Sequence, residues 1–146
     1  MLIVKKFGGS SVANKDRIFN VAKRCIEDYR AGHDVVVVLS AMGDTTDELI
    51  ALANTINPDA KKRELDMLLA TGEQVSIALM ASAFCAKGQP AVSFTGAQAG
   101  IKTNDKHSKA SILDVQACQV KQALDEGKIV IVAGFQGITD LGQITA

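Results

Sequence analysis

Four short apolar runs constrain the fold of this chain more than any other feature of its sequence. The runs cover residues 2–4, 35–39, 91–94 and 129–133, and most of their residues are β-branched. None of them alternates apolar with polar side chains, which is typical of strands that are buried on both faces. Because such strands occur in parallel sheets, the sequence predicts a mostly parallel β-sheet.

Helical patterns fill the segments between these runs. Apolar residues recur at spacings of three and four from Ile18 to Tyr29, and Gly32 is a suitable C-terminal stop for that helix. Three further helices are predicted, at residues 45–56, 64–87 and 116–126. Strands that alternate with helices predict an α/β fold with helices on both faces of the sheet.

Two segments depart from this alternation. Residues 64–87 keep helical spacing through Gly72, although glycine inside a helix costs about 1 kcal/mol relative to alanine, so we expect another part of the chain to approach the helix backbone there. After the fourth strand, residues 134–137 and 140–143 contain closely spaced glycines and predict a turn or hairpin.

The balance of charge argues against two classes of partner. Sixteen Lys and Arg residues offset sixteen Asp and Glu residues, so no net field holds the chain to nucleic acid or to an anionic membrane. The longest apolar stretch, residues 75–86, is shorter than the roughly 20 residues of a membrane span and predicts a buried helix. We therefore expect a small-molecule ligand and, at 146 residues, a single domain that is short for a two-substrate enzyme.

The cysteines and the first residues of the chain predict a reducing compartment. Cys25, Cys85 and Cys118 lie far apart among apolar residues and form no CxxC pair, so we expect buried thiols and neither disulfides nor zinc ligands. Lys5 and Lys6 follow a short apolar run, which lacks the length of a secretory signal. These features predict a cytoplasmic protein with no metal site of its own.

The sharpest local signal is the segment from Lys6 to Ser11, where the first strand ends and the first helix is predicted to begin. Gly8 and Gly9 allow backbone N–H groups to approach phosphate oxygens, a helix N-terminus adds partial positive charge, and Lys6 adds a full charge. The segment matches neither GxGxxG nor GxxxxGK[ST]. The residues alone leave two readings open, a phosphate loop or a plain glycine turn.

Two further segments carry polar groups suited to a substrate. Residues 40–46 follow the second strand, and because ligands of open parallel sheets lie beyond the carboxyl ends of strands, their hydroxyls are candidates to bind a small polar ligand. A helix N-cap formed by Asp44 or Thr45 is the alternative. Glu73 lies among largely apolar helix neighbours, where a buried carboxylate needs a partner such as a ligand ammonium. A structural salt bridge, or exposure at a helix break, is the alternative for Glu73.

The two histidines have no second metal-ligand candidate at short spacing. We therefore expect His33 and His107 to be surface histidines. The nearby Asp105, Lys106 and Lys109 predict a solvated loop, a kind of segment that also borders pockets.

Taken together, five segments resemble, in the same order, the motifs of bacterial aspartate kinases. They are Lys6-Phe7-Gly8-Gly9-Ser10-Ser11-Val12, Ser40-Ala41-Met42, Thr71-Gly72-Glu73-Gln74, Ser93-Phe94-Thr95-Gly96 and Val132-Ala133-Gly134-Phe135-Gln136-Gly137. The resemblance covers essentially the whole chain. Where Ser10 stands the family usually has threonine, and the change keeps the hydroxyl. The resemblance implies the fold of the amino acid kinase superfamily, a three-layer α/β/α sandwich with a mostly parallel sheet.

The resemblance also implies an activity, transfer of the γ-phosphoryl group of Mg-ATP to the side-chain carboxylate of L-aspartate at the start of lysine, threonine and methionine synthesis. By motif match, the ATP phosphates would be contacted by Lys6, which is also the catalytic candidate, Phe7, Gly8, Gly9 and Ser10. The aspartate site would be lined by Ser40, Thr46, Glu73 and Phe135, with Glu73 facing the substrate ammonium. A carboxylate acceptor is already an anion at pH 7, so the reaction needs charge neutralisation and no general base.

The family continues, beyond the position of Thr145, into a Gly-Arg-Gly-Gly-Ser-Asp segment, a nucleotide-binding half and usually ACT regulatory domains. We therefore expect residues 1–146 to be the amino-terminal, aspartate-binding part of an incomplete catalytic domain, inactive alone and prone to self-association through exposed sheet edges. Two other hypotheses stay open. One is another amino acid kinase, acting on glutamate, acetylglutamate or a nucleotide monophosphate, and the other is a non-catalytic assembly module or remnant.

Overall fold

The structure is a computed structural model that describes residues 1–146. The strands are β1 (Leu2–Phe7), β2 (Asp34–Leu39), β3 (Ala91–Phe94), β4 (Ile101–Thr103), β5 (Ile112–Val115), β6 (Ile129–Ala133), β7 (Gly137–Ile138) and β8 (Ile144–Thr145). The helices are α1 (Lys15–Arg30), α2 (Thr45–Ile56), α3 (Lys62–Ala86) and α4 (Cys118–Asp125), and a short 3-10 helix, η1 (Gly9–Val12), follows β1.

The four apolar runs form one parallel sheet, as predicted. Its strand order is β1-β2-β6-β3, and every neighbouring pair in it is parallel. The runs at β3 and β6 have the predicted bounds, whereas β1 continues through Lys5, Lys6 and Phe7. Because β2 and β6 lie in the middle of the sheet, their side chains are buried on both faces, which explains why these runs do not alternate.

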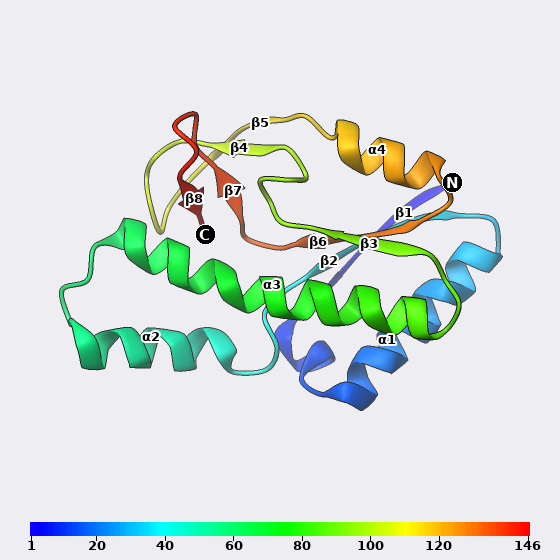
Figure 1. The fold of residues 1–146 in the computed structure, drawn as a ribbon, viewed down its shortest axis with the longest axis horizontal. Coiled ribbons are helices and arrows are strands. Elements are labelled where there is room, and N and C mark those ends of the chain that lie inside the picture. The colour runs from blue at the N-terminus through cyan, green and yellow to red at the C-terminus, as the bar shows by residue number, and fades with distance from the viewer.

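Helices cover both faces of this sheet, so the predicted three-layer α/β/α arrangement is confirmed. In Figure 1, α4 lies above the four strands, and α1 and α3 lie below them. The larger core packs α1 and α3 against one face through residues such as Cys25, Val37 and Phe84. The smaller core packs α4 against the other face through Ala123 and Val130.

The helix ends follow local sequence signals. The side chain of Asn14 accepts a hydrogen bond from the backbone N–H of Arg17 and caps α1. Gly32, with φ of +99°, ends that helix as predicted. The helix nevertheless begins later than the sequence indicated, because η1 separates it from β1.

The apolar stretch predicted as a buried helix lies within α3, which is half-buried. Ile77, Met80 and Phe84 face the core, whereas Val75 and Leu79 are exposed. By length and composition α3 also qualifies as a membrane span, with 44% of its most apolar window buried in this fold. A helix that packs in a protein core meets the same criterion, and α3 packs on the sheet beside α1.

A second, four-stranded sheet was not predicted. Its order is β5-β4-β7-β8, and it lies near the amino-terminal half of α3, beyond the main sheet in Figure 1. Its strands are only two to four residues long, too short for a periodic pattern to show in the sequence. The predicted hairpin after the fourth strand is confirmed, because β7 and β8 pair antiparallel.

The expectation of three buried thiols was wrong for two of them. Cys25 is buried in the core between α1 and the sheet, but Cys85 and Cys118 are exposed. Phe84 of α3 and Val120 of α4 pack into the two cores, whereas the nearby Cys85 and Cys118 are on exposed parts of the same helices. All three cysteines are free.

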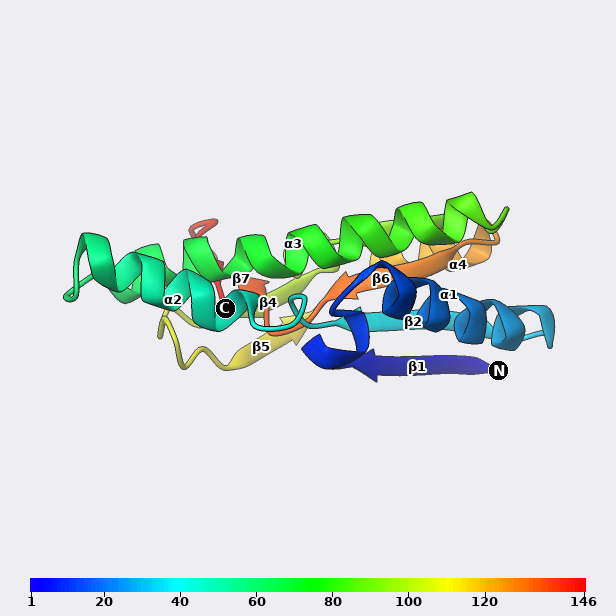
Figure 2. The same ribbon diagram turned by 90° about the horizontal axis from the view of Figure 1, so that it is seen from below.

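Strand β1 forms a free edge of the main sheet, visible along the bottom of Figure 2. It pairs only with β2, and Leu2 and Val4 expose 55% and 60% of their surface on one face. Unpaired edges with apolar side chains favour association with other chains. Self-association of the chain therefore stays a prediction with a structural basis.

Candidate functional site

The register of the main sheet brings three turns together. Phe7 is paired with Leu39, and Leu39 is paired with Ala133, so β1, β2 and β6 end at the same level. Backbone hydrogen bonds continue this alignment, from the N–H of Ser40 to Phe7 at 3.2 Å and from the N–H of Gly134 to Leu39 at 2.8 Å. The predicted glycine loop, the turn after β2 and the turn after β6 are therefore neighbours at the carboxyl edge of the sheet, where ligands of such sheets bind.

The two glycines of the first loop are there for different reasons. A Cβ on Gly9 would lie 2.8 Å from the carbonyl oxygen of Gly43 and 2.9 Å from that of Ala41, so packing alone requires a glycine. A Cβ on Gly8 would have nothing within 4 Å, and the extended backbone of Gly8 would accept any residue. The plain-turn reading therefore accounts for Gly9, while the open space at Gly8 suits close approach of a ligand to the backbone.

A cavity of about 320 Å³ lies where the turns meet. It is lined by Gly9, Ser40, Ala41, Gly43, Thr46, Leu69, Glu73, Phe135 and Ala146. We call it the acceptor pocket. It contains all four residues predicted for the aspartate site and one of the predicted phosphate residues.

Glu73 is the only carboxylate side chain in the acceptor pocket. It exposes only 6% of its surface and has no cationic side chain within salt-bridge distance. Burial raises the pKa of Glu73 above its usual range, and hydrogen bonds from its own backbone and from Gln136 partly oppose that effect. The structure thus rules out both alternatives for Glu73, a salt bridge and exposure.

Gln136 supports Glu73 and was not assigned a role from the sequence. Its side-chain amide donates to the carbonyl of Ala70 at 2.7 Å and reaches Oε2 of Glu73 at 3.5 Å. Gln136 is buried beside α3, directly after the turn that follows β6. Its role depends on a contact with α3, far away in sequence, which no local spacing indicates.

Phe135 is held in an unusual conformation at the mouth of the pocket. Its φ is +57°, in the left-handed region that non-glycine residues rarely adopt, and its side chain is 69% exposed. The Lys6 ammonium lies 4.4 Å from the centroid of its ring. Backbone strain and an exposed aromatic ring are features that cluster at functional sites, and here they bring a cation to the rim of the acceptor pocket.

Ser40 and Thr46 contribute hydroxyl groups that make no hydrogen bond within the protein. The alternative reading as helix caps is not supported, because Asp44 makes no capping bond and the Thr45 hydroxyl donates to the carbonyl of Met42. Ser76 of α3 donates to the carbonyl of Ser40 at 2.8 Å and fixes the turn against the helix. Two hydroxyls are thus free to bind a polar ligand.

Of the five predicted phosphate residues only Gly9 lines the acceptor pocket; Lys6 stands at its rim, and Phe7, Gly8 and Ser10 lie outside its lining. The side chain of Phe7 packs against the core on the α1 side of the sheet. Ser10 is exposed on η1, and its carbonyl accepts a hydrogen bond from Arg17 at 3.0 Å. Only their backbone groups, or the Ser10 hydroxyl, are available to a ligand at Gly8.

The prediction for His107 as a surface residue was wrong. Its side chain is only 12% exposed, and Nδ1 lies 2.9 Å from Oδ2 of Asp66, a fully buried carboxylate on α3. Asp66 and His107 are far apart in sequence, so no local spacing reveals the pair. His33, directly before β2, is half-buried.

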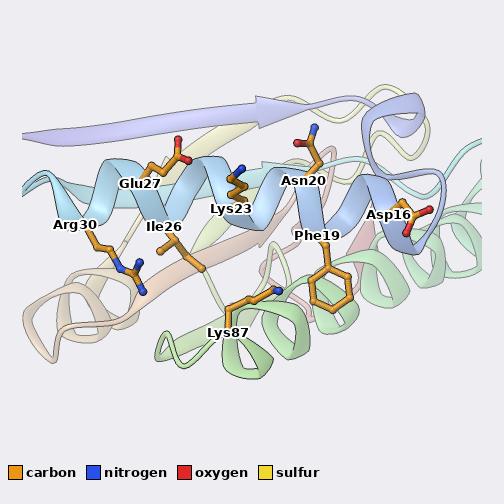
Figure 3. A pocket seen from close by; sticks show the side chains of 8 residues that line it. All are labelled: Asp16, Phe19, Asn20, Lys23, Ile26, Glu27, Arg30 and Lys87. Atoms are coloured by element: carbon orange, nitrogen blue, oxygen red, sulfur yellow. The ribbon is translucent and has the colours of Figure 1, made fainter.

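A larger cavity, of about 460 Å³, lies away from these turns. Figure 3 shows it between α1 and the end of α3, with the Lys87 side chain extended toward Phe19. The Lys87 ammonium lies 5.3 Å from the centre of that ring. Five of its eight lining residues are charged, two negatively and three positively. None of the eight belongs to a turn at the carboxyl edge of the sheet. We therefore regard the smaller acceptor pocket as the site.

Comparison with known proteins identifies relatives of the whole chain. Residues 1–146 match the amino acid kinase family. An aspartokinase of Geobacillus stearothermophilus is 57% identical over 99% of this chain, and a crystal structure of aspartate kinase from Synechocystis is 47% identical over the full chain with a TM-score of 0.84. The structure of aspartokinase III from Escherichia coli with aspartate and ADP is 24% identical over the full chain with a TM-score of 0.87.

These relatives are much longer than the chain. It spans 35% of the Geobacillus protein, 24% of the Synechocystis chain and 43% of the Escherichia coli chain. The similarity therefore covers less than half of the length of each of these relatives.

Proposed function

The chain belongs to the amino acid kinase family, and from that premise we propose that residues 1–146 form the acceptor-binding part of an aspartate kinase. The reaction proposed for the whole protein is transfer of the γ-phosphoryl group of ATP to the side-chain carboxylate of L-aspartate. The product would be 4-phospho-L-aspartate, used for lysine, threonine and methionine synthesis in the cytoplasm. The aspartokinase relatives support this choice of acceptor.

The observation that carries the proposal is the composition of the acceptor pocket. It combines one buried carboxylate, Glu73, with the hydroxyls of Ser40 and Thr46, and Lys6 stands at its rim over Phe135. A buried carboxylate without a cation is unfavourable, and a substrate ammonium would neutralise it. The hydroxyls would then bind the remaining polar groups of a small amino acid.

The proposed chemistry needs charge neutralisation more than proton transfer. A carboxylate oxygen of aspartate attacks the γ-phosphorus, a new P–O bond forms, and the bond from that phosphorus to the oxygen of the leaving ADP breaks. The acceptor is already ionised at pH 7, so no side chain has to remove a proton. Lys6 and the backbone N–H groups at Gly8 would offset the repulsion between the two anions.

Magnesium enters this proposal bound to the phosphates of ATP, where it supplies positive charge to the γ-phosphoryl group. No group of three or more His, Cys, Asp or Glu side chains in the structure forms a metal site. We therefore assign no residue of this chain to the ion. The phosphates themselves would lie against Gly8, where the structure leaves open space.

Complementation tests the proposal. We would mix the chain with the separately produced remainder of a similar aspartokinase, measure consumption of ATP with each acceptor, and identify acyl phosphate products by hydroxylamine trapping. L-Aspartate should be phosphorylated at least about tenfold faster than L-glutamate, N-acetylglutamate or a nucleoside monophosphate, and the chain alone should give no turnover. A preference for one of the other acceptors would contradict the assignment, and so would an active mixture that contains Glu73→Gln.

A further inference from the structure

A second cavity, of about 390 Å³, adjoins the acceptor pocket. Phe135 lines both cavities. The second cavity is walled by β2, β6 and the turn after β6 on one side, and by Ser108, Lys109 and Ala110 on the other. We call this the loop cavity, because the segment between β4 and β5 closes it.

The loop cavity has a distinct charge. Lys109 is the only charged side chain among its lining residues, and no Asp or Glu side chain lines it. Ser108 adds a hydroxyl to the cavity lining. The hydroxyls of Thr103 and Thr145 are 2.8 Å apart and are hydrogen-bonded to each other. A cavity with one cation and no carboxylate side chain favours an anionic group.

Asp66 holds the wall of the loop cavity in place. Both of its carboxylate oxygens lie 3.2 Å from the backbone nitrogen of Ser108, and Oδ2 also meets Nδ1 of His107 at 2.9 Å. The other ring nitrogen of His107 lies 3.3 Å from Oε1 of Gln143, in the connection between β7 and β8. The fully buried Asp66 thus ties the loop to α3 and, through His107, to the hairpin.

The backbone of Ser108 is strained. Ser108 has a φ of +66°, which is unfavourable for serine, and the two bonds from its N–H to Asp66 stabilise that conformation. Since Ser108 immediately precedes Lys109, its conformation determines where the lysine leaves the backbone. Because the buried Asp66 carboxylate stabilises the strained backbone of Ser108 beside the cavity, we infer that the loop holds Lys109 in a defined position.

We propose that the loop cavity is an anion-binding site with Lys109 as its cation, and that Asp66 and His107 are positioning residues that hold Lys109 there. The ligand class is a carboxylate or phosphate group. Both groups occur in the reactants of the proposed function, so this inference deepens that function and rests partly on it. The acceptor pocket and the loop cavity, which share Phe135 as a lining residue, would then bind neighbouring polar groups of the reactants.

The test is a two-dimensional NMR titration of the chain, amidated at its carboxyl terminus because Ala146 also lines the cavity. Inorganic phosphate and succinate serve as separate probes of the two sources of negative charge. We expect the amide signals of Ser108, Lys109 and Ala110 to shift with at least one probe. Lys109→Met should weaken that response about tenfold, as expected for the loss of one charge-assisted contact. Lys106→Met, on the same loop but outside the cavity lining, should leave it unchanged.

Further variants test the positioning residues. Asp66→Asn and His107→Phe should shift the Ser108 and Lys109 signals without ligand and weaken the anion response, whereas His107→Asn, which offers an N–H near the position of Nδ1, should restore most of it. Signals of the main sheet serve as the folding control. An unchanged response in both Asp66→Asn and His107→Phe would overturn the positioning role.

The same titration separates this inference from the proposed function. Phosphate that shifts Gly8 and Gly9, while neither phosphate nor succinate shifts residues 108–110, would support the phosphate loop and overturn the anion site. The reverse pattern would support the anion site while arguing against the phosphate loop. Equal weakening by Lys106→Met and Lys109→Met would also overturn the assignment, because it would indicate general attraction to a basic loop.

Discussion

Gly72 lies against Ala41, and a Cβ placed on Gly72 would be only 2.9 Å from the Cβ of Ala41. The sequence predicted such an approach from a glycine inside a long helix, and the structure confirms it. The contact lets α3 pack directly on the turn after β2. Because Glu73 is the next residue, the same contact places its carboxylate at the acceptor pocket.

We predict that Gly72→Ala destabilises the chain by about 1–3 kcal/mol, because the added methyl overpacks the contact with Ala41. In an exposed helix the same change would stabilise by about 1 kcal/mol, so the sign of the effect is informative. Urea unfolding followed by circular dichroism measures it. A more stable Gly72→Ala variant would show that the contact is loose.

The glycine loop offers a matched pair of variants. Gly9→Ala should destabilise by about 1–3 kcal/mol, since its methyl would meet two carbonyl oxygens. Gly8→Ala should fold normally, or gain about 0.4–1 kcal/mol from reduced freedom of the unfolded chain, but should weaken phosphate binding. Unfolding curves and phosphate titrations of both variants provide the comparison. Full phosphate binding by a stable Gly8→Ala variant would argue against the phosphate loop.

Glu73→Gln should stabilise the fold and abolish binding of an amino acid ligand. Burial raises the pKa of Glu73, so the folded state holds its proton to higher pH than the unfolded state does. The contribution of Glu73 to the free energy of unfolding is therefore fully present below the unfolded pKa of about 4.5. It is lost as the pH rises through the higher pKa of the folded state. Melting curves from pH 4 to pH 8 should show the advantage of the variant growing with pH. A variant less stable than the parent at pH 8 would contradict this.

The three thiols should react in two classes. Burial raises the pKa of the Cys25 thiol to about 11, whereas Cys85 and Cys118 are exposed. Because the thiolate is the reactive form, a colorimetric thiol reagent at pH 8 should modify two thiols quickly and the third only after unfolding. Cys25→Ser provides the control, and its rapid phase should be unchanged. Three rapid equivalents in the native chain would show that the core around Cys25 opens.

The sequence predicted those parts of the fold that depend on local pattern. The runs at β2, β3 and β6 are dominated by apolar residues without alternation, and α2 begins and ends at the predicted residues. The second sheet was missed because strands such as β7, of two residues, carry no periodicity. The exposure of Cys85 was misjudged because apolar neighbours in sequence do not decide which side of a helix faces the core.

In the candidate site, too, residues within local motifs were predicted and residues that depend on long-range contacts were missed. Ser40, Thr46, Glu73 and Phe135 were predicted from the resemblance of their motifs to a known family, and the structure places all four in one cavity. Asp66 and His107 escaped prediction because their contact joins α3 to a distant loop. Gln136 was passed over because its role depends on reaching across to α3. Contacts between segments far apart in the sequence produce no local residue spacing from which they could be predicted.

The most direct test of the account is an NMR titration of the carboxyl-amidated chain with L-aspartate, with Glu73→Gln as the matched variant. Ser40, Thr46, Glu73 and Phe135 line one cavity with Lys6 at its rim, so the amides of these four residues should shift together, and the variant should lose the response. D-Aspartate and L-glutamate should bind more weakly. Shifts confined to another surface, or an unchanged response in Glu73→Gln, would contradict the proposal that this pocket binds the acceptor.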